Sequence, residues 1–205
     1  MPSLGLRADQ PLTVWPKNGL VGILDLEFTA WEGSFQRGWS EPWEWREIVQ
    51  VGLVLVDAGR AFSVCDEVEI TVRPLRNPVL SGYFTSLTGI TQAWLEEKAR
   101  PFDEAMATLL NVGASAELII FNGADGEILR ENCVMREVAP PWPEEKMFNF
   151  RPLLARTLDR PQSELTSSDL PALAGIEVAG RAHSALHDCK AISAGFARWR
   201  TSGIL

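Results

Sequence analysis

Two carboxylates near the start of the chain stand two residues apart in a segment that is otherwise apolar. The run LVGILDLEF at 20–28 has the character of a buried strand whose end carries Asp25 and Glu27. Side chains alternate across a strand, so both carboxylates share one face of the sheet, where they repel each other unless a cation lies between them. Such hard oxygen ligands suit Mg²⁺ or Mn²⁺. Taken alone, the pair favours the simpler interpretation of two solvated carboxylates at a strand end.

Two later segments contain residues that could complete a metal site. In FNGADGEIL at 121–129, Asp125 lies where an apolar strand changes to a helix, which is where sites form in open α/β sheets. Capping the helix is the ordinary role of such an aspartate. In HSALHD at 183–188, His183 precedes Asp188 near the start of the last helix, so the carboxylate could hold a metal while the histidine accepts a proton from water. By chance alone the pattern HxxxxD is common.

The elements predicted around these residues define a mixed sheet. After the strand at 20–28, residues 48–57 and 64–72 predict two further strands with a turn at 57–59, and the three form an antiparallel meander. Residues 117–121 add a short strand. Helical segments are predicted after Pro74 and Pro78 with a break at 88–89, and over 101–112, 125–138, 151–159, 169–175 and 184–200. An α/β fold with helices flanking the sheet follows.

The composition favours one soluble domain covering residues 1–205, because no linker-like stretch divides the chain. No apolar run is long enough to span a membrane, and the first 20 residues contain no export signal, so no membrane partner is expected. Cys65, Cys133 and Cys189 are widely spaced, which favours reduced thiols and a cytoplasmic location. The net charge of −8 argues against a protein that coats nucleic acid by charge alone. It still allows a small contact with the end of a nucleic-acid chain.

The order of the three motifs is more specific than any one of them. DxE on a first strand, an aspartate at a strand-to-helix switch and HxxxxD on a last helix resemble the DEDDh (DnaQ-like) 3′→5′ exonucleases. The segments EIVQVGLVLVD at 47–57 and LSGYFTSLTGIT at 80–91 are similar to the corresponding parts of that family. The likeness covers about residues 20–200 and is greatest for the branch that trims histone-message and small-RNA 3′ ends, with its bacterial relatives.

This resemblance implies a ribonuclease H-like fold with two divalent cations, Mg²⁺ or Mn²⁺. It also implies hydrolysis of single-stranded RNA or DNA from the 3′ end, with RNA favoured and nucleoside 5′-monophosphates released. The residues that carry over as metal ligands are Asp25, Glu27, Asp125 and Asp188, and His183 carries over as the general base. Phe28, Thr29 and Leu87 carry over as contacts to the terminal nucleotide, although Leu87 could equally be a core residue. His187 is expected to be a solvated or supporting side chain, and Glu127 to point away from the site.

The chain departs from the family in two places. Relatives often have an aromatic-Gly-Asp-aromatic run before the central aspartate, whereas this chain has Phe-Asn-Gly-Ala at 121–124. The resemblance therefore does not determine how deep the nucleotide pocket is. The segment at 31–45 is unusually rich in tryptophan. We expect its indoles to form a rim that stacks on bases, with cover for the loop's own apolar surface or a dimer contact as alternatives. These residues are Trp31, Trp39, Trp43 and Trp45.

Two other functions fit the same motifs. One is a catalytically silent module that binds nucleic acid or a protein, with the segment at 31–45 as its candidate binding surface. Release of mononucleotides from a short oligomer separates it from an enzyme. The other is a polymerase proofreading subunit, which differs in its partner and not in its chemistry.

Overall fold

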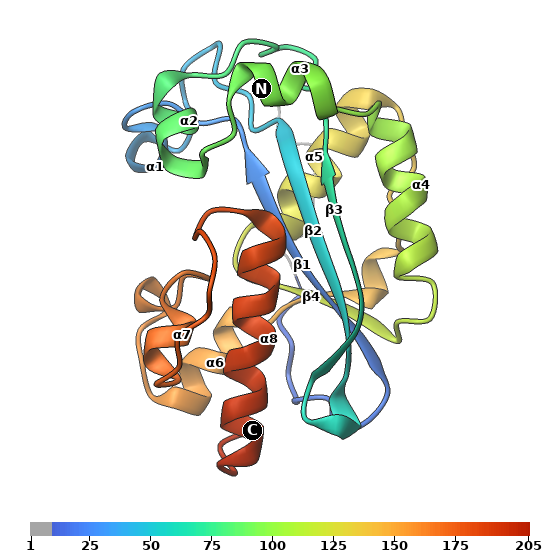
Figure 1. The fold of residues 1–205 in the computed structure, drawn as a ribbon, viewed down its shortest axis with the longest axis vertical. Helices are drawn as coiled ribbons and strands as arrows, with labels where there is room; N and C mark the ends of the chain where they lie inside the picture. The colour runs from blue at the N-terminus through green and yellow to red at the C-terminus, as the bar shows by residue number, and fades with distance from the viewer. Residues whose placement is uncertain (1–9) are drawn as a thin grey trace.

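The computed structural model describes residues 10–205 and contains a five-stranded sheet with the order β3-β2-β1-β4-β5 (Figure 1). β1 pairs antiparallel with β2, and β2 pairs antiparallel with β3. β4 and β5 run parallel to β1. The strands are β1 (Leu20–Phe28), β2 (Ile48–Asp57), β3 (Ser63–Thr71), β4 (Leu118–Phe121) and β5 (Met147–Asn149). The predicted mixed sheet, an antiparallel meander extended by parallel strands, is confirmed.

The helices lie where the sequence predicts them, with two exceptions. They are α1 (Ser34–Arg37), α2 (Gly82–Thr88), α3 (Gln92–Lys98), α4 (Phe102–Val112), α5 (Asp125–Arg136), α6 (Arg151–Leu158), α7 (Leu170–Leu173) and α8 (Ala185–Thr201). Short 3-10 turns cover η1 (Ala58–Arg60), η2 (Glu144–Lys146) and η3 (Gln162–Glu164). The sequence did not predict α1, and the predicted end of α5 at residue 138 is too late, because Glu137 adopts a left-handed conformation with φ 55°.

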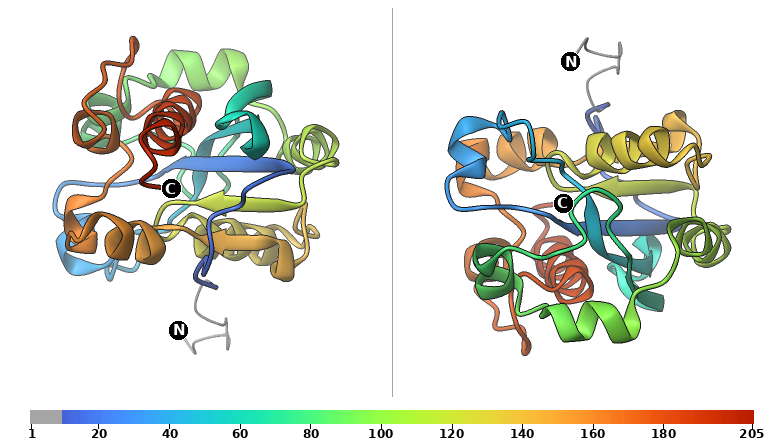
Figure 2. Two further views of the ribbon diagram at one scale, coloured as in Figure 1. Left: turned by 90° about the horizontal axis from the view of Figure 1, so that it is seen from below. Right: turned by 90° about the horizontal axis from the view of Figure 1, so that it is seen from above.

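Alternate residues of β1 pack into cores on the two faces of the sheet. Val21 and Ile23 share a core with apolar side chains of α8, whereas Leu24 and Leu26 share one with α4 and α5. Figure 2 shows helices on both sides of the sheet. The odd-numbered residues of β1 therefore face α8, and Asp25 and Glu27 continue that face toward the carboxyl end of the strand.

The start of α8 lies directly against β2. A Cβ atom on Gly52 would come within 2.3 Å of the backbone of Ala185, so only glycine allows this approach. The buried side chain of Gln50 accepts a hydrogen bond from the Ala185 backbone N–H at 3.0 Å. Because Gly52 pairs with Asp25 across the sheet, this contact brings the first turn of α8 to the carboxylates of β1.

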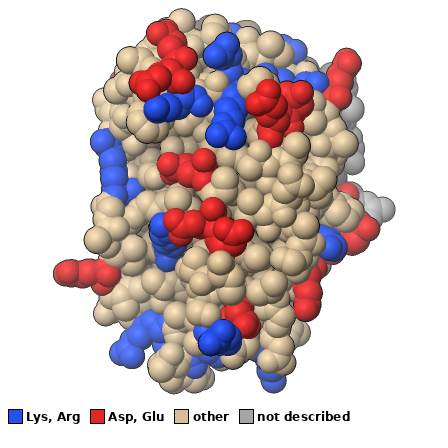
Figure 3. All heavy atoms as spheres, turned by 45° about the vertical axis from the view of Figure 1, so that its right-hand side comes forward, with Lys and Arg blue, Asp and Glu red and all other residues tan. Residues whose placement is uncertain are grey.

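Three further features of the described residues concern membrane-spanning helices, cysteines and surface charge. Within 10–205, no helix is both long and apolar enough to cross a membrane. Cys65, Cys133 and Cys189 are free thiols. On the face shown in Figure 3, basic side chains are interspersed with acidic ones and form no continuous stripe. Residues 1–9, which begin the segment expected to lack an export signal, lie outside the described part of the chain.

Candidate active site

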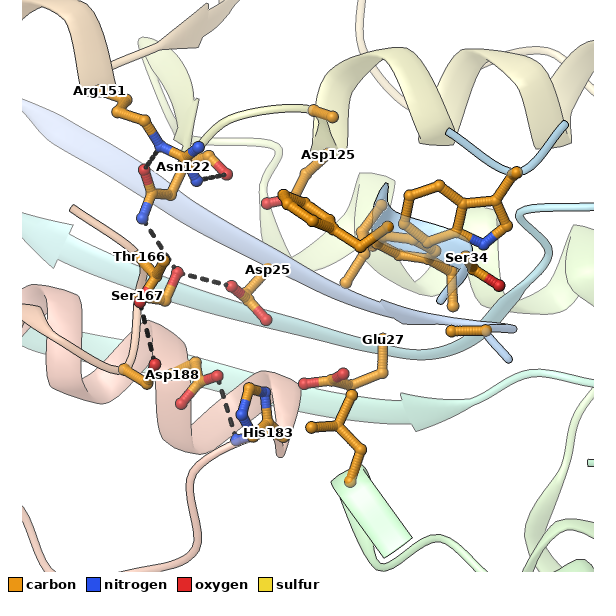
Figure 4. A pocket seen from close by; sticks show the side chains of 18 of the residues that line it. Asp25, Glu27, Ser34, Asn122, Asp125, Arg151, Thr166, Ser167, His183 and Asp188 are labelled. Carbon is orange, nitrogen blue, oxygen red and sulfur yellow. Dashed lines mark hydrogen bonds between the residues drawn. The ribbon is translucent and has the colours of Figure 1, made fainter. Parts of the chain in front are cut away.

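The motif residues predicted to carry the chemistry meet in one pocket of about 380 Å³ at the carboxyl ends of β1 and β4. Figure 4 shows their side chains converging from the sheet and from two helices. The pocket is lined by Asp25, Glu27, Asp125, His183 and Asp188, together with apolar and hydroxyl side chains. Residues separated by more than 150 positions in the sequence thus form one chemical environment.

Each carboxylate is placed by a different element. Leu24 of β1 pairs with Phe121 of β4, so the carboxyl ends of these parallel strands lie side by side. Asp125 begins α5 just beyond β4, and Asp188 lies in the first turn of α8. All four carboxylate residues are buried, with exposed fractions between 4% and 8%. Buried like charges at such close quarters oppose folding unless protons or cations compensate them.

The raised pKa values of the carboxyls follow from this burial. Loss of solvent, then the charge of Asp125, holds the pKa of Asp25 well above its ordinary value. Burial and the charge of Asp188 raise the pKa of Glu27 to about 8. Burial also raises the pKa of Asp188 to about 6, against a hydrogen bond from the His183 backbone N–H that lowers it. Without a cation these carboxyls therefore keep their protons to a higher pH than usual, and a bound cation would take the place of those protons.

The donor set fits divalent cations. Ligand atoms of Glu27, His183 and Asp188 all lie within 4.8 Å of one another, a spacing that allows them to surround an ion. Asp188 Oδ1 is buried and has no hydrogen-bond partner in residues 10–205. An unpaired buried carboxylate oxygen destabilises the fold unless a metal ion or a water bound to the metal lies beside it. Carboxylate oxygens are the ligands that Mg²⁺ and Mn²⁺ prefer.

His183 lies on the segment just before α8 and adopts φ 61°, a left-handed conformation that is uncommon outside glycine. Its backbone N–H donates to Asp188 Oδ2 at 3.3 Å, so the histidine and the carboxylate are held together. Burial and the nearby charge of Arg181 lower the pKa of the His183 imidazole. His187 does not line the pocket and packs instead against Gly180, where an added Cβ would meet its ring at 2.2 Å.

The three predicted nucleotide contacts have different placements. Phe28 and Leu87 line the pocket. Thr29 does not, because its side chain is turned into the protein: its hydroxyl donates to the backbone oxygen of Trp45 and accepts from the Glu47 N–H at 3.0 Å. A side-chain contact from Thr29 to substrate is therefore disfavoured. Glu127 points away from the site, as expected, and pairs with Arg46 at 2.6 Å.

A chain of hydrogen bonds that the sequence did not predict supports Asp25. Arg151 Nε donates to Asn122 Oδ1 at 2.7 Å, Asn122 Nδ2 donates to Ser167 Oγ at 3.2 Å, and Ser167 Oγ donates to Asp25 Oδ1 at 3.1 Å (Figure 4). The chain fixes one oxygen of the Asp25 carboxylate. Arg151 is the first residue of α6 and lies two positions after the end of the three-residue strand β5, so the sequence offered only a polar residue after a short apolar run.

Of the four tryptophans predicted to form a rim, only Trp39 lines the pocket. Trp45 lies under the guanidinium of Arg76 at 3.7 Å, and the Trp43 backbone oxygen accepts from Asn77 Nδ2 at 3.0 Å. The rim prediction is therefore wrong for Trp31, Trp43 and Trp45, which do not line the pocket. A phenylalanine that was not predicted, Phe35, lines the pocket beside Trp39.

The raised pKa of Glu27 predicts a pH-dependent stability of the metal-free protein. The unfolded state releases the Glu27 proton near pH 4.5, but the folded state retains it until about pH 8, so stability falls as pH rises through this window. The loss is on the order of a few kcal/mol, or roughly 10 °C in Tm. In EDTA, differential scanning fluorimetry of Glu27→Gln should show a shallower fall than that of the parent. Parallel profiles for the two proteins would contradict the assigned burial of the Glu27 charge.

Comparisons with known proteins agree with this geometry. The family model for exonucleases (RNase_T) matches residues 23–196. The 3′-5′ exoribonuclease 1 of Rattus norvegicus and that of Mus musculus are each 27% identical over 183 residues, 84% of this chain and 50% of theirs. The chain thus spans about half the length of the curated relatives it matches.

Solved structures share the fold. The nuclease domain of 3′hExo, a DEDDh family member bound to rAMP, has a TM-score of 0.76 at 23% identity and covers 91% of this chain and 94% of its own. A 3′-exonuclease whose structure concerns 3′-end specific recognition of the histone mRNA stem-loop has a TM-score of 0.78 at 22% identity. The match covers 92% of this chain and 84% of that one. Cell-death related nuclease 4 has a TM-score of 0.74 at 19% identity, and the match covers 91% of this chain and 65% of that one.

The chain has the ribonuclease H-like fold of these solved structures, and the family model covers the residues that form the pocket. This chain belongs to the exonuclease family, and the resemblance to DEDDh exonucleases that the order of its motifs indicated is confirmed.

Proposed function

We propose that this chain is a metal-dependent 3′→5′ exonuclease that shortens single-stranded nucleic-acid ends, RNA in preference to DNA, and releases nucleoside 5′-monophosphates using two divalent cations. The observation that carries the proposal is the meeting of four buried carboxylates and one histidine in a single pocket. Family membership supports the reaction class. The names of the rat and mouse relatives support RNA and the 3′→5′ direction.

In this mechanism the side chains of the pocket have separate roles. Asp25, Glu27, Asp125 and Asp188 would hold the cations, which when bound supply Lewis-acid chemistry at the scissile phosphate and lower the pKa of water. His183 accepts the proton of the attacking water on a ring nitrogen. Its lowered pKa keeps the imidazole neutral near pH 7, so it is ready to accept that proton.

The size of the pocket supports a substrate with an exposed end. A volume of about 380 Å³ lies at the lower end of the range for small-molecule sites, which favours entry of one terminal nucleotide over entry of a duplex. The net charge of −8 argues against binding of long stretches of nucleic acid through charge alone. Both properties favour recognition of an unpaired end. We also expect the three free cysteines to reflect a reducing, cytoplasmic compartment.

Digestion of matched oligomers tests this function. Single- and double-stranded RNA and DNA of one sequence, each with Mg²⁺ or Mn²⁺, should be shortened fastest when single-stranded, and RNA faster than DNA. Equal rates on blunt duplexes and single strands would contradict the proposed substrate. Binding without any hydrolysis would instead support the silent binding module.

A further inference from the structure

The segment between α6 and α7 reaches the carboxylates of the pocket through one hydroxyl group. Ser167 Oγ lies 3.1 Å from Asp25 Oδ1, and Figure 4 shows the serine beside the aspartate. Asp25 is only 6% exposed, so water has little access with which to replace this contact. Ser167 is therefore placed to orient the Asp25 carboxylate.

Asn122, which directly follows β4, fixes the direction in which the Ser167 hydroxyl donates. Its Oδ1 faces Arg151 Nε at 2.7 Å, and a guanidinium nitrogen can only donate. Its Nδ2 faces the backbone oxygen of Leu165 at 2.9 Å, which can only accept. The amide therefore has one orientation, in which Nδ2 also donates to Ser167 Oγ at 3.2 Å. The Ser167 proton is then directed to Asp25 Oδ1.

The contacts that hold Asn122 are built into the backbone at the ends of β4 and β5. Asn149 Oδ1 accepts from the backbone N–H groups of Gly123 at 3.1 Å and Arg151 at 3.0 Å, and its Nδ2 donates to the Gly123 backbone oxygen at 3.0 Å. Gly123 has φ 89°, and a Cβ atom there would lie 2.6 Å from the Arg151 guanidinium. Glycine thus allows the arginine to lie across this turn and to reach Asn122.

We propose that Ser167 is a positioning residue for the cation ligand Asp25, an inference that rests on the proposed metal-dependent function. Its hydroxyl engages Oδ1 and leaves Oδ2 outside this chain of hydrogen bonds, so that Oδ2 is the oxygen presented to a cation. A hydroxyl donor also favours the ionised carboxylate, which is the form that binds a cation. Asn122 and Arg151 act through Ser167 by orienting its hydroxyl.

Calorimetric titration with Mn²⁺ in the absence of substrate tests this role. Ser167→Ala should bind Mn²⁺ roughly 10- to 100-fold more weakly than the parent, the usual effect of removing a group that orients a metal ligand. Ser167→Thr keeps the hydroxyl and should restore most of the affinity. The titrations are made well below the Tm that each variant has in EDTA, so that unfolding does not contribute to the loss.

Ser193→Ala is the matched control for the loss of a buried serine hydroxyl. Ser193 is 3% exposed and lies on α8 outside the pocket, where its hydroxyl donates to the Phe62 backbone oxygen at 2.9 Å. This variant should retain the Mn²⁺ affinity of the parent even where its Tm falls. Parent-like affinity in Ser167→Ala, an equal loss in Ser193→Ala, or no recovery in Ser167→Thr would overturn the positioning role.

A double-mutant cycle tests whether Asn122 acts through Ser167. Asn122→Ala should weaken Mn²⁺ binding, because the Ser167 hydroxyl is then no longer directed to Asp25. The double variant with Ser167→Ala should bind no more weakly than Ser167→Ala alone, since two residues that act through one contact are not additive. Additive losses would overturn the assigned direction of these hydrogen bonds.

Hydrolysis measured on the same proteins separates failure of this role from failure of the proposed function. If the Mn²⁺ affinities follow the expected pattern but no oligomer is hydrolysed, the positioning role stands and the exonuclease proposal fails. If oligomers are hydrolysed but Ser167→Ala binds Mn²⁺ as the parent does, the exonuclease proposal stands and the positioning role fails.

Discussion

An Asp25→Asn variant is expected to hydrolyse oligomers at least roughly 10³-fold more slowly than the parent, while its fold is retained or slightly stabilised. A lost anionic ligand removes several kcal/mol of charge stabilisation, and each 1.36 kcal/mol is tenfold in rate. The same change relieves repulsion from Asp125 and Glu27, whose charges contribute to the raised pKa of Asp25. Single-turnover hydrolysis at saturating Mn²⁺ and Tm in EDTA measure the two effects.

A matched pair on α5 controls for general effects of charge removal. Asp125→Asn should lose activity as Asp25→Asn does. Glu127→Gln removes a carboxylate two residues away that pairs with Arg46 outside the pocket, and it should remain active. Near-normal turnover in Asp25→Asn, or an equal loss in Glu127→Gln, would remove the metal-ligand assignment.

His183→Ala is expected to lower turnover by roughly 10²- to 10⁴-fold, the usual contribution of a positioned general base. Parent activity should rise with pH through a histidine pKa below 6.5, because burial and Arg181 lower that pKa and the neutral imidazole is the active form. This rise should vanish in His183→Ala. Initial rates between about pH 5 and 8 give the profile.

The control for this variant is the second histidine of the same motif. His187 lies against Gly180 and outside the pocket, so His187→Ala should change turnover far less. Mn²⁺ affinity measured by calorimetry separates a base from a ligand, because His183 lies close enough to Glu27 and Asp188 to contact a shared ion. Strong loss of Mn²⁺ affinity in His183→Ala would make it a ligand, and equal kinetic losses in the two variants would show that the base is misassigned.

Local sequence patterns were sufficient to predict the parts of the site that lie on regular helices and strands. The alternation of side chains along 20–28 predicted that Asp25 and Glu27 share a face, and the structure places both with Val21 and Ile23 on the side of α8. The apolar face of α8 was likewise visible as a periodic pattern. Such features depend on neighbours in the sequence, which is why they can be predicted from it.

Features built by distant residues could not be predicted in this way. Ser167 supports Asp25 across 142 positions, in a segment between α6 and α7 that has no periodicity. The three-residue strand β5 is too short for a pattern and forms only because it pairs with β4. Trp39 and Trp43 lie four residues apart in one tryptophan-rich segment, but only the folded loop shows that Trp39 lines the pocket and Trp43 does not.

Hydrolysis of a single-stranded RNA oligomer labelled at its 5′ end, with Mg²⁺ or with EDTA, tests the central claim most directly. We expect a ladder of labelled products that shorten one nucleotide at a time with Mg²⁺, release of nucleoside 5′-monophosphates, and no change in EDTA. Immediate release of a labelled mononucleotide would show attack from the 5′ end, and undiminished hydrolysis in EDTA would show that the four carboxylates do not act through a metal.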